Sequence, residues 1–308
     1  MGLSGLISFA GNFVYPGSAW GKVLDRLDGR QLNDVGYDEH YIALYKQEDD
    51  EIMGFWYEVE DDFLFMPFIK RRIEGYEGLY DFETAYGYSG PVATTTSPKF
   101  LAPAWDCFRV GAKEVGIIVG FIRFHPVLHT QDFFGTWYPL LVATEDRDSV
   151  VLDLNTDLQT VWRNYSKDNK ERILKAERLG MTITCESNGA SLEIFAEFYE
   201  KRMLELNARE DHRFGQQYFT DLEKVGSEAF QVYFAVLNGK RIGAALILLS
   251  KNFCHYHLSS SNSSYFKYGP NNMLRHGVIK SMLAQNYKGK ILFGCGRSTN
   301  RDDSLLNF

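Results

Sequence analysis

Residues 231–249 read QVYFAVLNGKRIGAALILL, two apolar runs on either side of Asn238-Gly239. A two-residue hairpin turn of type I′ needs positive φ at both central residues, and Asn-Gly is the pair that adopts this geometry most readily. The stretch therefore predicts an antiparallel β-hairpin, with strands over 231–237 and 240–249.

The residues that follow the hairpin alternate between strand and helix patterns. We expect a third strand from Phe253 to Ser259, a helix from Pro270 to Ala284 and another strand over 290–294. Strand, helix and strand in this order form a crossover unit. Ligands are expected where the first strand ends and the helix begins.

Two helical regions precede the hairpin. Residues 157–179 read as one or two helices, ended by Gly180 at the C′ position, and six basic residues lie between Arg163 and Arg178. Ser191 is expected to cap a further helix, whose apolar residues recur at helical spacing. The second half of the chain thus has a mixed α/β layer order.

The first half of the chain has weaker patterns. Residues 62–69 read as a strand, and a loop rich in Gly and Tyr is expected from Tyr76 to Pro91. A helix is expected over 100–115 and a buried strand over 116–124.

The length of 308 residues favours two packed domains over one core. The polar stretch from Ala143 to Ser149 is the best boundary, which gives domains over 1–148 and 149–308. Residues 1–150 hold 12 Lys and Arg against 23 Asp and Glu, whereas residues 151–308 hold 21 against 17. The second half suits an anionic ligand, but a broad nucleic-acid footprint needs a larger excess of positive charge.

Several classes of protein are excluded by composition. The four cysteines are widely spaced and form no Cys-x-x-Cys pair, so we expect no disulfide framework and no metal site. The N-terminus has no basic region ahead of an apolar one, and the longest apolar run, 115–122, is too short to cross a membrane. We expect a cytoplasmic protein.

Six short motifs occur in an order that resembles the FemAB-like branch of the GNAT acyltransferase superfamily. They are Tyr86-Gly-Tyr-Ser-Gly-Pro91, Phe121-Ile-Arg-Phe-His-Pro126, Arg172-Ile-Leu-Lys-Ala176, Tyr256-His-Leu-Ser-Ser260, Gly269-Pro-Asn-Asn272 and Phe293-Gly-Cys-Gly-Arg297, the last followed by Asp302-Asp-Ser-Leu305. The resemblance covers roughly residues 60–308. It implies an α/β (α+β) fold of two GNAT-like domains, each a mixed, mostly antiparallel sheet flanked by helices.

The resemblance also has implications for activity. The best-known members of the branch transfer amino acids from aminoacyl-tRNA to peptidoglycan precursors, and others are described as acetyltransferases of cell-surface polysaccharide pathways. This chain lacks the long helical hairpin that some tRNA-using members insert in the second domain. Members usually continue past the position of Phe308 with a Lys and further strands, so we expect the C-terminus to be truncated.

Tyr256 and His257 are the predicted catalytic residues. They are neighbours on one strand, so they face opposite sides of the sheet, and His255 is in phase with His257. A neutral imidazole or a Tyr hydroxyl can help to relay the proton that an amine acceptor loses. The alternative is that both side chains have only packing or structural hydrogen-bonding roles.

The predicted substrate-binding residues lie in several segments, each with a structural alternative. Arg123 and His125 are paired cationic groups that suit a phosphate or carboxylate, or else form salt bridges within the acidic first half. Tyr86 and Tyr88 suit the wall of a sugar or nucleotide site, or else anchor their loop. The remaining candidates are Arg172 and Lys175, which are otherwise solvated, and Ser259 and Ser260, which otherwise turn the chain.

The predicted donor-binding residues are Lys267, Asn271 and Asn272, at the start of the Pro270 helix. Backbone N–H groups and the helix dipole favour an anion there. The Gly-x-Gly spacing of typical GNAT loops is absent and Pro270 has no N–H, so an ordinary capped helix is the alternative.

The function that these observations favour is an N-acyltransferase or aminoacyltransferase. It would form an amide on an amino group of a cell-envelope precursor, either an amino sugar or a peptide stem, free or nucleotide-linked. We expect no tightly bound cofactor, with acyl-CoA or aminoacyl-tRNA as the co-substrate and tRNA therefore as a possible partner. A catalytically inactive GNAT pair that binds a glycan or a peptide is the alternative.

Overall fold

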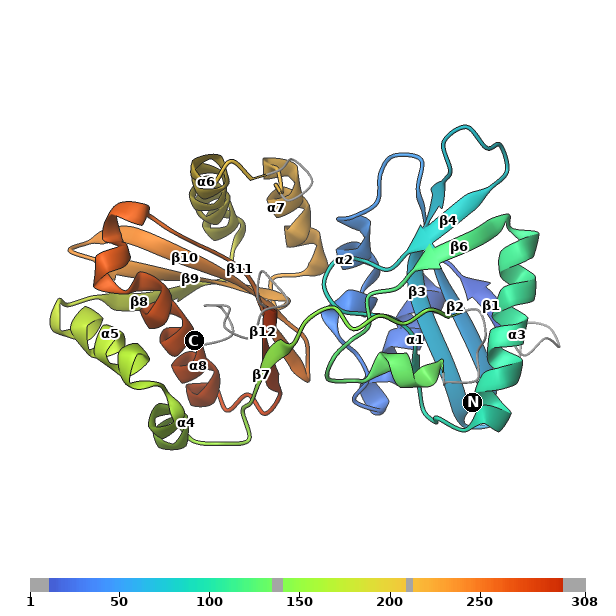
Figure 1. Cartoon of the computed structure of the whole chain (residues 1–308), viewed down its shortest axis with the longest axis horizontal. Coiled ribbons are helices and arrows are strands. Elements are labelled where there is room, and N and C mark those ends of the chain that lie inside the picture. The colour runs from blue at the N-terminus through green and yellow to red at the C-terminus, as the bar shows by residue number, and fades with distance from the viewer. Residues whose placement is uncertain (1–10, 135–140, 209–212, 296–308) are drawn as a thin grey trace. The chain divides into compact units, whose positions relative to one another are not determined.

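The computed structural model describes residues 11–134, 141–208 and 213–295. The chain divides into two compact units, Met1–Thr144 and Glu145–Phe308, each with its own sheet (Figure 1). Both units combine a mixed, mostly antiparallel sheet with flanking helices, which confirms the predicted fold class. The predicted division into domains 1–148 and 149–308 stays a prediction.

The sheet of the first unit has the order β1-β2-β3-β4-β6, with β5 beside β3. All pairs are antiparallel except β4 and β6, which are parallel. The strands are β1 Gly11–Val14, β2 Glu51–Val59, β3 Asp62–Arg72, β4 Tyr80–Glu83, β5 Val92–Ala93 and β6 Ile117–Phe121.

Helix α3, Pro98–Glu114, makes the crossover from β4 to β6 and covers one face of this sheet. The indole Nε1 of Trp105 donates to the carbonyl of Phe133 at 2.7 Å, and the ring is fully buried. Phe108 packs edge-to-face on the Trp105 ring, and Phe55 and Phe68 pack on Phe108 in the same aromatic core. The other helices are α1 Ser18–Gly29 and α2 Glu39–Ala43, with 3-10 turns at Val35–Tyr37 and Thr130–Phe133.

Two expectations about the first unit are wrong. The segment from Tyr76 to Pro91 is not all loop, because it contains β4, which pairs with both β3 and β6. The strand expected to be buried over 116–124 ends at Phe121, and 57% of the Phe121 residue surface is exposed. The reason is position, since β6 is the outermost strand and only part of its surface is covered.

The sheet of the second unit has the order β7-β12-β11-β10-β9-β8, and only β11 and β12 are parallel. The predicted hairpin is confirmed as β9 and β10, with φ of 51° at Asn238 and 73° at Gly239. The strands are β7 Ser149–Asp153, β8 Thr182–Glu186, β9 Phe230–Leu237, β10 Lys240–Leu249, β11 Phe253–Ser261 and β12 Lys290–Cys295.

Helices cover both faces of this second sheet (Figure 1). On one face, residues of α5 and α8 such as Ile173 and Val278 share a core with Tyr233 and Ile247. On the other face, α6 packs on β10 and β11, and α7 packs on α6. The helices are α4 Leu158–Asn164, α5 Lys167–Arg178, α6 Gly189–Glu205, α7 Gln216–Leu222 and α8 Pro270–Ala284, with 3-10 turns at Glu223–Val225 and Ser263–Tyr268.

The helix ends described here for the second unit agree with those predicted from the sequence, except at one N-cap. Helix α8 has the predicted bounds, and Gly180, with φ of 77°, follows α5 as predicted. Ser191 is not the cap of α6, because Asn188 is. The Asn188 Oδ1 accepts from the Ser191 N–H at 2.9 Å, and the Ser191 Oγ accepts from the Asn188 N–H at 3.3 Å. Because of this reciprocal capping box the helix begins at Gly189, earlier in the chain than it would with Ser191 as its cap.

Among the described residues, none of the helices has both the length and the apolar character that crossing a membrane requires.

Candidate active site

The parallel strands β11 and β12 diverge toward their carboxyl ends. Their register joins Phe253 to Lys290, Cys254 to Ile291 and His255 to Leu292, and within the described residues the pairing stops there. Each strand continues further, to Ser261 and Cys295. Helix α8, which follows β11 in the chain, begins near this opening. A ligand-binding crevice is expected at such a place, outside the carboxyl ends of parallel strands.

Strand β11 has a β-bulge at the same level. Leu246 of β10 lies opposite Leu258, but the next residue, Ile247, lies opposite Tyr256, so β11 accommodates His257 as one extra residue. Bulges locally disrupt the hydrogen-bond ladder and re-aim side chains, and they are common beside active sites. The bulge therefore places both predicted catalytic residues at the opening.

Tyr256 faces the side of the sheet covered by α8. The residue is only 8% exposed, and its ring packs in the same core as Cys254 and Ile247. The guanidinium carbon of Arg275, on α8, lies 5.5 Å from the ring centre. Burial raises the pKa of Tyr256, although the positive charge of Arg275 partly opposes the increase. The phenol is therefore protonated at neutral pH and is able to donate a hydrogen bond.

His257 faces the opposite side, which α6 and α7 cover. Its Nε2 and the hydroxyl of Tyr218, on α7, are 2.7 Å apart. The ring of Phe214 lies 6.2 Å from the imidazole. Burial, together with the nearby His255, lowers the pKa of His257 to about 3. The imidazole is therefore neutral at physiological pH, and the two residues face opposite sides as predicted.

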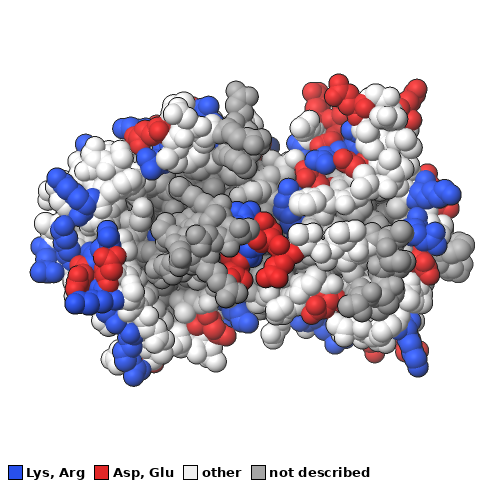
Figure 2. Space-filling view, viewed as in Figure 1, with Lys and Arg blue, Asp and Glu red and all other residues white. Residues whose placement is uncertain are grey.

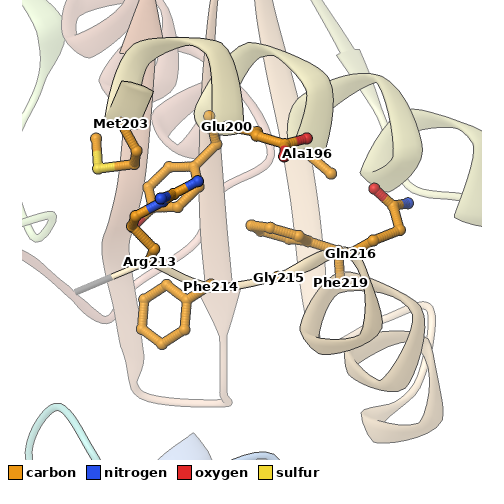
Figure 3. A pocket seen from close by; sticks show the side chains of 9 residues that line it. Ala196, Glu200, Met203, Arg213, Phe214, Gly215, Gln216 and Phe219 are labelled. Carbon is orange, nitrogen blue, oxygen red and sulfur yellow. The ribbon is translucent and has the colours of Figure 1, made fainter. Parts of the chain in front are cut away.

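A pocket of about 300 Å³ lies between α6 and the segment that leads into α7 (Figure 3). Phe214 forms part of its wall and stacks on Tyr218 at 4.3 Å between ring centres, which connects the pocket to the His257 side of the bulge. The lining residues are Ala196, Tyr199, Glu200, Met203, Arg213, Phe214, Gly215, Gln216 and Phe219.

The serines at the end of β11 have different surroundings. Ser259 is exposed. Ser260 is buried, and its hydroxyl donates to the carbonyl of Phe198 in α6 at 2.6 Å. The hydroxyl of Ser261 donates to the Oδ1 of Asn271 at 2.6 Å. Of the two predicted binding serines, Ser259 is the more accessible.

The predicted donor-binding residues lie around the start of α8, where residues of α5 contact them. Asn272 donates from its Nδ2 to the Oδ1 of Asn169, on α5, at 2.9 Å. Lys175, also on α5, donates from its Nζ to the carbonyl of Lys267 at 2.9 Å. The Nζ of Lys267 itself lies 5.0 Å from the ring centre of Tyr268. Both asparagine side chains thus already have partners within the protein, and any anion there would rely on the lysines and the backbone.

Arg172 is close to this helix start as well. A Cβ built on Gly269 would lie 3.3 Å from the carbonyl oxygen of Arg172, so α5 passes close to the turn ahead of α8. The Arg172 guanidinium forms an exposed ion pair with Asp168 at 2.7 Å. Lys and Arg gather over α5 with acidic residues between them (Figure 2). The structure therefore brings Arg172, Lys175 and Lys267 into one neighbourhood.

The candidate residues of the first unit have internal partners. Arg123 donates to the carbonyl of Thr84 at 2.7 Å and lies 3.4 Å from the Glu83 carboxylate. His125 is fully buried, and its Nε2 lies 3.0 Å from the Asp34 carboxylate. Its Nδ1 accepts from the N–H groups of Val127 and Leu128, so the ring proton is on Nε2 and points to Asp34.

Tyr86 and Tyr88 differ in exposure. Tyr86 is 47% exposed, and its carbonyl accepts from the hydroxyl of Tyr41 at 3.1 Å. Tyr88 is half-buried, with its ring 6.2 Å from that of His125. Both contacts help to anchor the loop, and the exposed ring of Tyr86 is the one that a ligand can reach.

The first unit also has a parallel pair, β4 and β6, but this pair does not open. Beyond Phe121 the connection continues, because the N–H of Arg123 donates to Thr84 Oγ1 at 2.9 Å and that of Ser89 donates to the Arg123 carbonyl at 3.1 Å. The ring of Phe82 lies over Gly120, where a Cβ would overlap it. The opening is therefore a property of the second unit.

Sequence analysis missed most of the residues that surround the candidate catalytic pair. Tyr218 and Phe214 lie about 40 residues from His257 and share no motif with it. Of the charged pocket residues, Glu200 lies in α6 and Arg213 in the irregular segment ahead of α7, and neither belongs to a motif. Arg275 had a usable signal, because it lies one turn into the helix that begins at the predicted donor site.

A family model described as an acetyltransferase (GNAT) domain matches residues 163–299. No curated protein sequence matches the chain. Among solved structures, that of FemX has a TM-score of 0.67 at 10% identity and covers 86% of this chain and 85% of its own. A tandem GNAT protein from the clavulanic acid biosynthesis pathway has a TM-score of 0.50 at 9% identity, with 94% and 91% covered.

A third similar structure is a domain assigned to a lysylphosphatidylglycerol synthetase of Agrobacterium fabrum. It has a TM-score of 0.52 at 14% identity and covers 90% of this chain and 79% of its own. At these identities the structural likeness concerns the fold.

The two sheets, each with a strand–helix–strand crossover, define an α/β protein of two GNAT-like units. The match to the GNAT acetyltransferase domain model lies within the second unit. This match supports the predicted resemblance to the GNAT superfamily, and the similarity to FemX confirms the predicted fold of the whole chain.

Proposed function

We propose that this protein is an N-acyltransferase that forms an amide on an amino group of a cell-envelope precursor, and that the reaction takes place where β11 and β12 diverge. The observation that carries the proposal is this opening, which has Tyr256 on one side and His257 on the other. The FemX-like fold supports the choice of a cell-envelope acceptor, an amino sugar or a peptide stem.

The chemistry is direct transfer. The acceptor nitrogen attacks the acyl carbonyl and forms the C–N bond, while the C–S bond of a thioester or the C–O bond of an aminoacyl ester breaks. The proton lost by the nitrogen ends on the departing thiolate or alkoxide. The protein contributes proximity and a hydrogen bond to the charge that develops on oxygen or on the leaving group.

Tyr256 is the proposed hydrogen-bond donor in this step. Its buried phenol keeps its proton because burial raises its pKa. His257, with a pKa near 3, is too weak a base to deprotonate an ammonium group. We assign it the role of a neutral hydrogen-bonding partner of Tyr218 that keeps the bulge and the pocket wall in place, and the acceptor therefore reacts as the neutral amine.

Two donors suit the proposal, acyl-CoA and aminoacyl-tRNA. Both present phosphates, and the cations Arg172, Lys175 and Lys267 surround the start of α8, next to the opening. Charge-assisted hydrogen bonds from these residues are the proposed contacts to the donor. No tightly bound cofactor is part of the proposal.

The test is a transfer assay with mass-spectrometric detection of the amide, using acetyl-CoA or aminoacyl-tRNA with amino sugars and muropeptide stems as acceptors. Tyr256→Phe should lower kcat by about 10²-fold or more with a small change in KM, because one donor to the transition state is lost. Tyr233→Phe is the matched control, since that phenol is also buried on the α8 face but belongs to β9.

Equal kcat values for Tyr256→Phe and wild type would contradict the assignment of the site. Binding of a glycan or a peptide stem with no product from either donor would overturn the proposed enzyme, and would favour a catalytically inactive binding module instead.

A further inference from the structure

The pocket between α6 and α7 contains two opposite charges over an apolar floor. Figure 3 shows Arg213 reaching from the segment ahead of α7 toward α6, the helix that carries Glu200. Among the described residues, neither side chain belongs to an ion pair within 4.0 Å, although other Arg and Glu side chains nearby do, such as Arg202 with Glu205. Within the described residues, the pocket therefore presents a guanidinium and a carboxylate that have no ion-pair partner.

The floor of the pocket is aromatic. Tyr199 and Phe219 are 5% and 1% exposed, and their ring centres lie 5.7 Å apart in an edge-to-face arrangement. Ala196 and Met203 of α6 complete the apolar surface. Contact between this floor and a hydrocarbon chain of a ligand is favourable. The two charged groups then determine which polar groups the ligand can carry.

We propose that this pocket binds the α-amino acid group of a ligand, a carboxylate and an ammonium or amine on one carbon with a side chain attached. The planar fork of Arg213 suits the carboxylate, and the Glu200 carboxylate suits the amino group. The side chain of the ligand lies against Tyr199 and Phe219.

A ligand with one charge matches the pocket less well. A simple carboxylate would satisfy Arg213 but would meet the like charge of Glu200, and a simple amine would satisfy Glu200 but would meet Arg213. A zwitterion meets an opposite charge at both ends, so complementarity selects it over each half-ligand.

The pocket lies close to the bulge of β11, so the bound amino acid group would belong to the substrate. Phe214, in the pocket wall, stacks on Tyr218, whose hydroxyl is 2.7 Å from His257 at the bulge. That the amino acid group belongs to the acceptor, as a residue of a peptide stem, rests on the proposed function. Binding of the group itself does not, and it is measured without any donor.

The experiment is calorimetry of the full chain with three matched probes, L-leucine, 3-methylbutylamine and 4-methylpentanoate. The amine lacks only the carboxylate of leucine, and the acid lacks only its amino group. We expect L-leucine to bind at least tenfold more tightly than either half, since each charge-assisted hydrogen bond contributes at least that factor when it is well formed.

Variants identify the pocket as the site. Arg213→Gln and Glu200→Gln should each weaken L-leucine binding about tenfold, and Arg213→Gln should remove most of the preference for leucine over the amine. Arg202→Gln and Glu197→Gln are the matched controls, because both residues lie on α6 but neither lines the pocket. Thermal unfolding of every variant reports whether the fold is intact.

Two results would overturn the proposal. One is that all three probes bind alike, or that none binds to the wild-type protein at millimolar concentration. The other is that Arg213→Gln and Glu200→Gln lower the unfolding temperature with a strong mutual coupling but leave leucine binding unchanged, which would make the two charges a structural pair. Leucine binding that passes these tests in a protein without transferase activity would support the pocket and reject the proposed function.

Discussion

His257 makes the second unit sensitive to acid. Its pKa is about 3 in the folded protein, compared with about 6.5 for an unfolded histidine. The unfolded state therefore binds one more proton than the folded state between these values. Stability from the neutral imidazole is fully present above pH 6.5 and is lost as the pH falls toward 3.

Urea unfolding at pH 7.5 and pH 5.5 measures this effect. From His257 alone we expect the free energy of unfolding to fall by at most about 1 kcal/mol over this interval, because the residue is only partly buried. His257→Gln should remove that part of the pH dependence, and the exposed His40→Gln should not. An unchanged pH slope in His257→Gln would show that the folded imidazole titrates normally.

Asp34 and His125 form a buried pair that supports the loop after β6. Asp34→Ala leaves the His125 Nε2–H without this acceptor in a fully buried site, and it also removes the Oδ1 contact to the Val35 N–H at 2.7 Å. We expect a loss of about 3 kcal/mol in the free energy of unfolding. Asp25→Ala, an exposed change on α1, should cost less than about 0.5 kcal/mol in the same denaturant titration. Similar costs for the two variants would contradict this.

At the scale of residues, the sequence predicted which side chains sit on β11 but not what surrounds them. Alternation along a strand was enough to place Tyr256 and His257 on opposite faces. The contact between His257 and Tyr218 depends on how α7 packs against the rest of the unit, and a local sequence pattern does not predict this packing. The ion pairs of Arg123 and Arg172 are likewise set by tertiary and helical neighbours that a motif does not show.

At the scale of elements, the pairing of the parallel strands β4 and β6 depends on the contact between Phe82 and Gly120. Gly120→Ala places a Cβ in the buried Phe82 ring, so the ring or one of the two strands has to shift. We expect a loss of about 1–3 kcal/mol in the free energy of unfolding of the first unit. The measurement is chemical denaturation followed by the intrinsic fluorescence of the tryptophans, four of which lie in residues 1–144.

Gly21→Ala is the control for this change. Gly21 lies within α1, and no atom lies within 4 Å of the place that an alanine methyl would occupy, so alanine should stabilise the helix by about 0.5–1 kcal/mol. The two glycine changes are thus expected to have opposite signs. A neutral or stabilising Gly120→Ala would mean that β4 and β6 separate easily.

Elements with strong local signals were predicted well. The hairpin follows from Asn238-Gly239, and the bounds of α8 follow from Pro270 and the apolar spacing after it. Strand β4 was missed because its four residues lie among Gly and Tyr and are held by pairing on both sides. The cap of α6 was misplaced because Asn188 and Ser191 are both good caps, and only geometry shows which one begins the helix.

At the scale of the whole molecule, the two units have separate sheets and separate cores, which supports independent unfolding. Hydrogen exchange of the intact chain tests this. Gly120→Ala should lower the protection of amides in β3 and leave those in β10 unchanged. Gly277→Ala, whose Cβ would lie 2.7 Å from Ile183 in the second unit, should do the reverse. Equal loss of protection in both sheets would show a single cooperative unit.

The contact between Phe82 of β4 and Gly120 of β6 has a consequence for how homologous sequences vary. The proposed reaction site is in the second unit, so we expect the residues at this contact in the first unit to be constrained only by packing. Here the Phe82 ring occupies the space that a side chain at position 120 would need. Selection at this contact therefore acts on the combined volume of the side chains at positions 82 and 120, and not on either residue alone. Among homologues, a larger residue at position 120 should therefore appear together with a smaller one at position 82, whereas no such exchange is expected between Tyr256 and His257, whose side chains lie on opposite faces of their sheet.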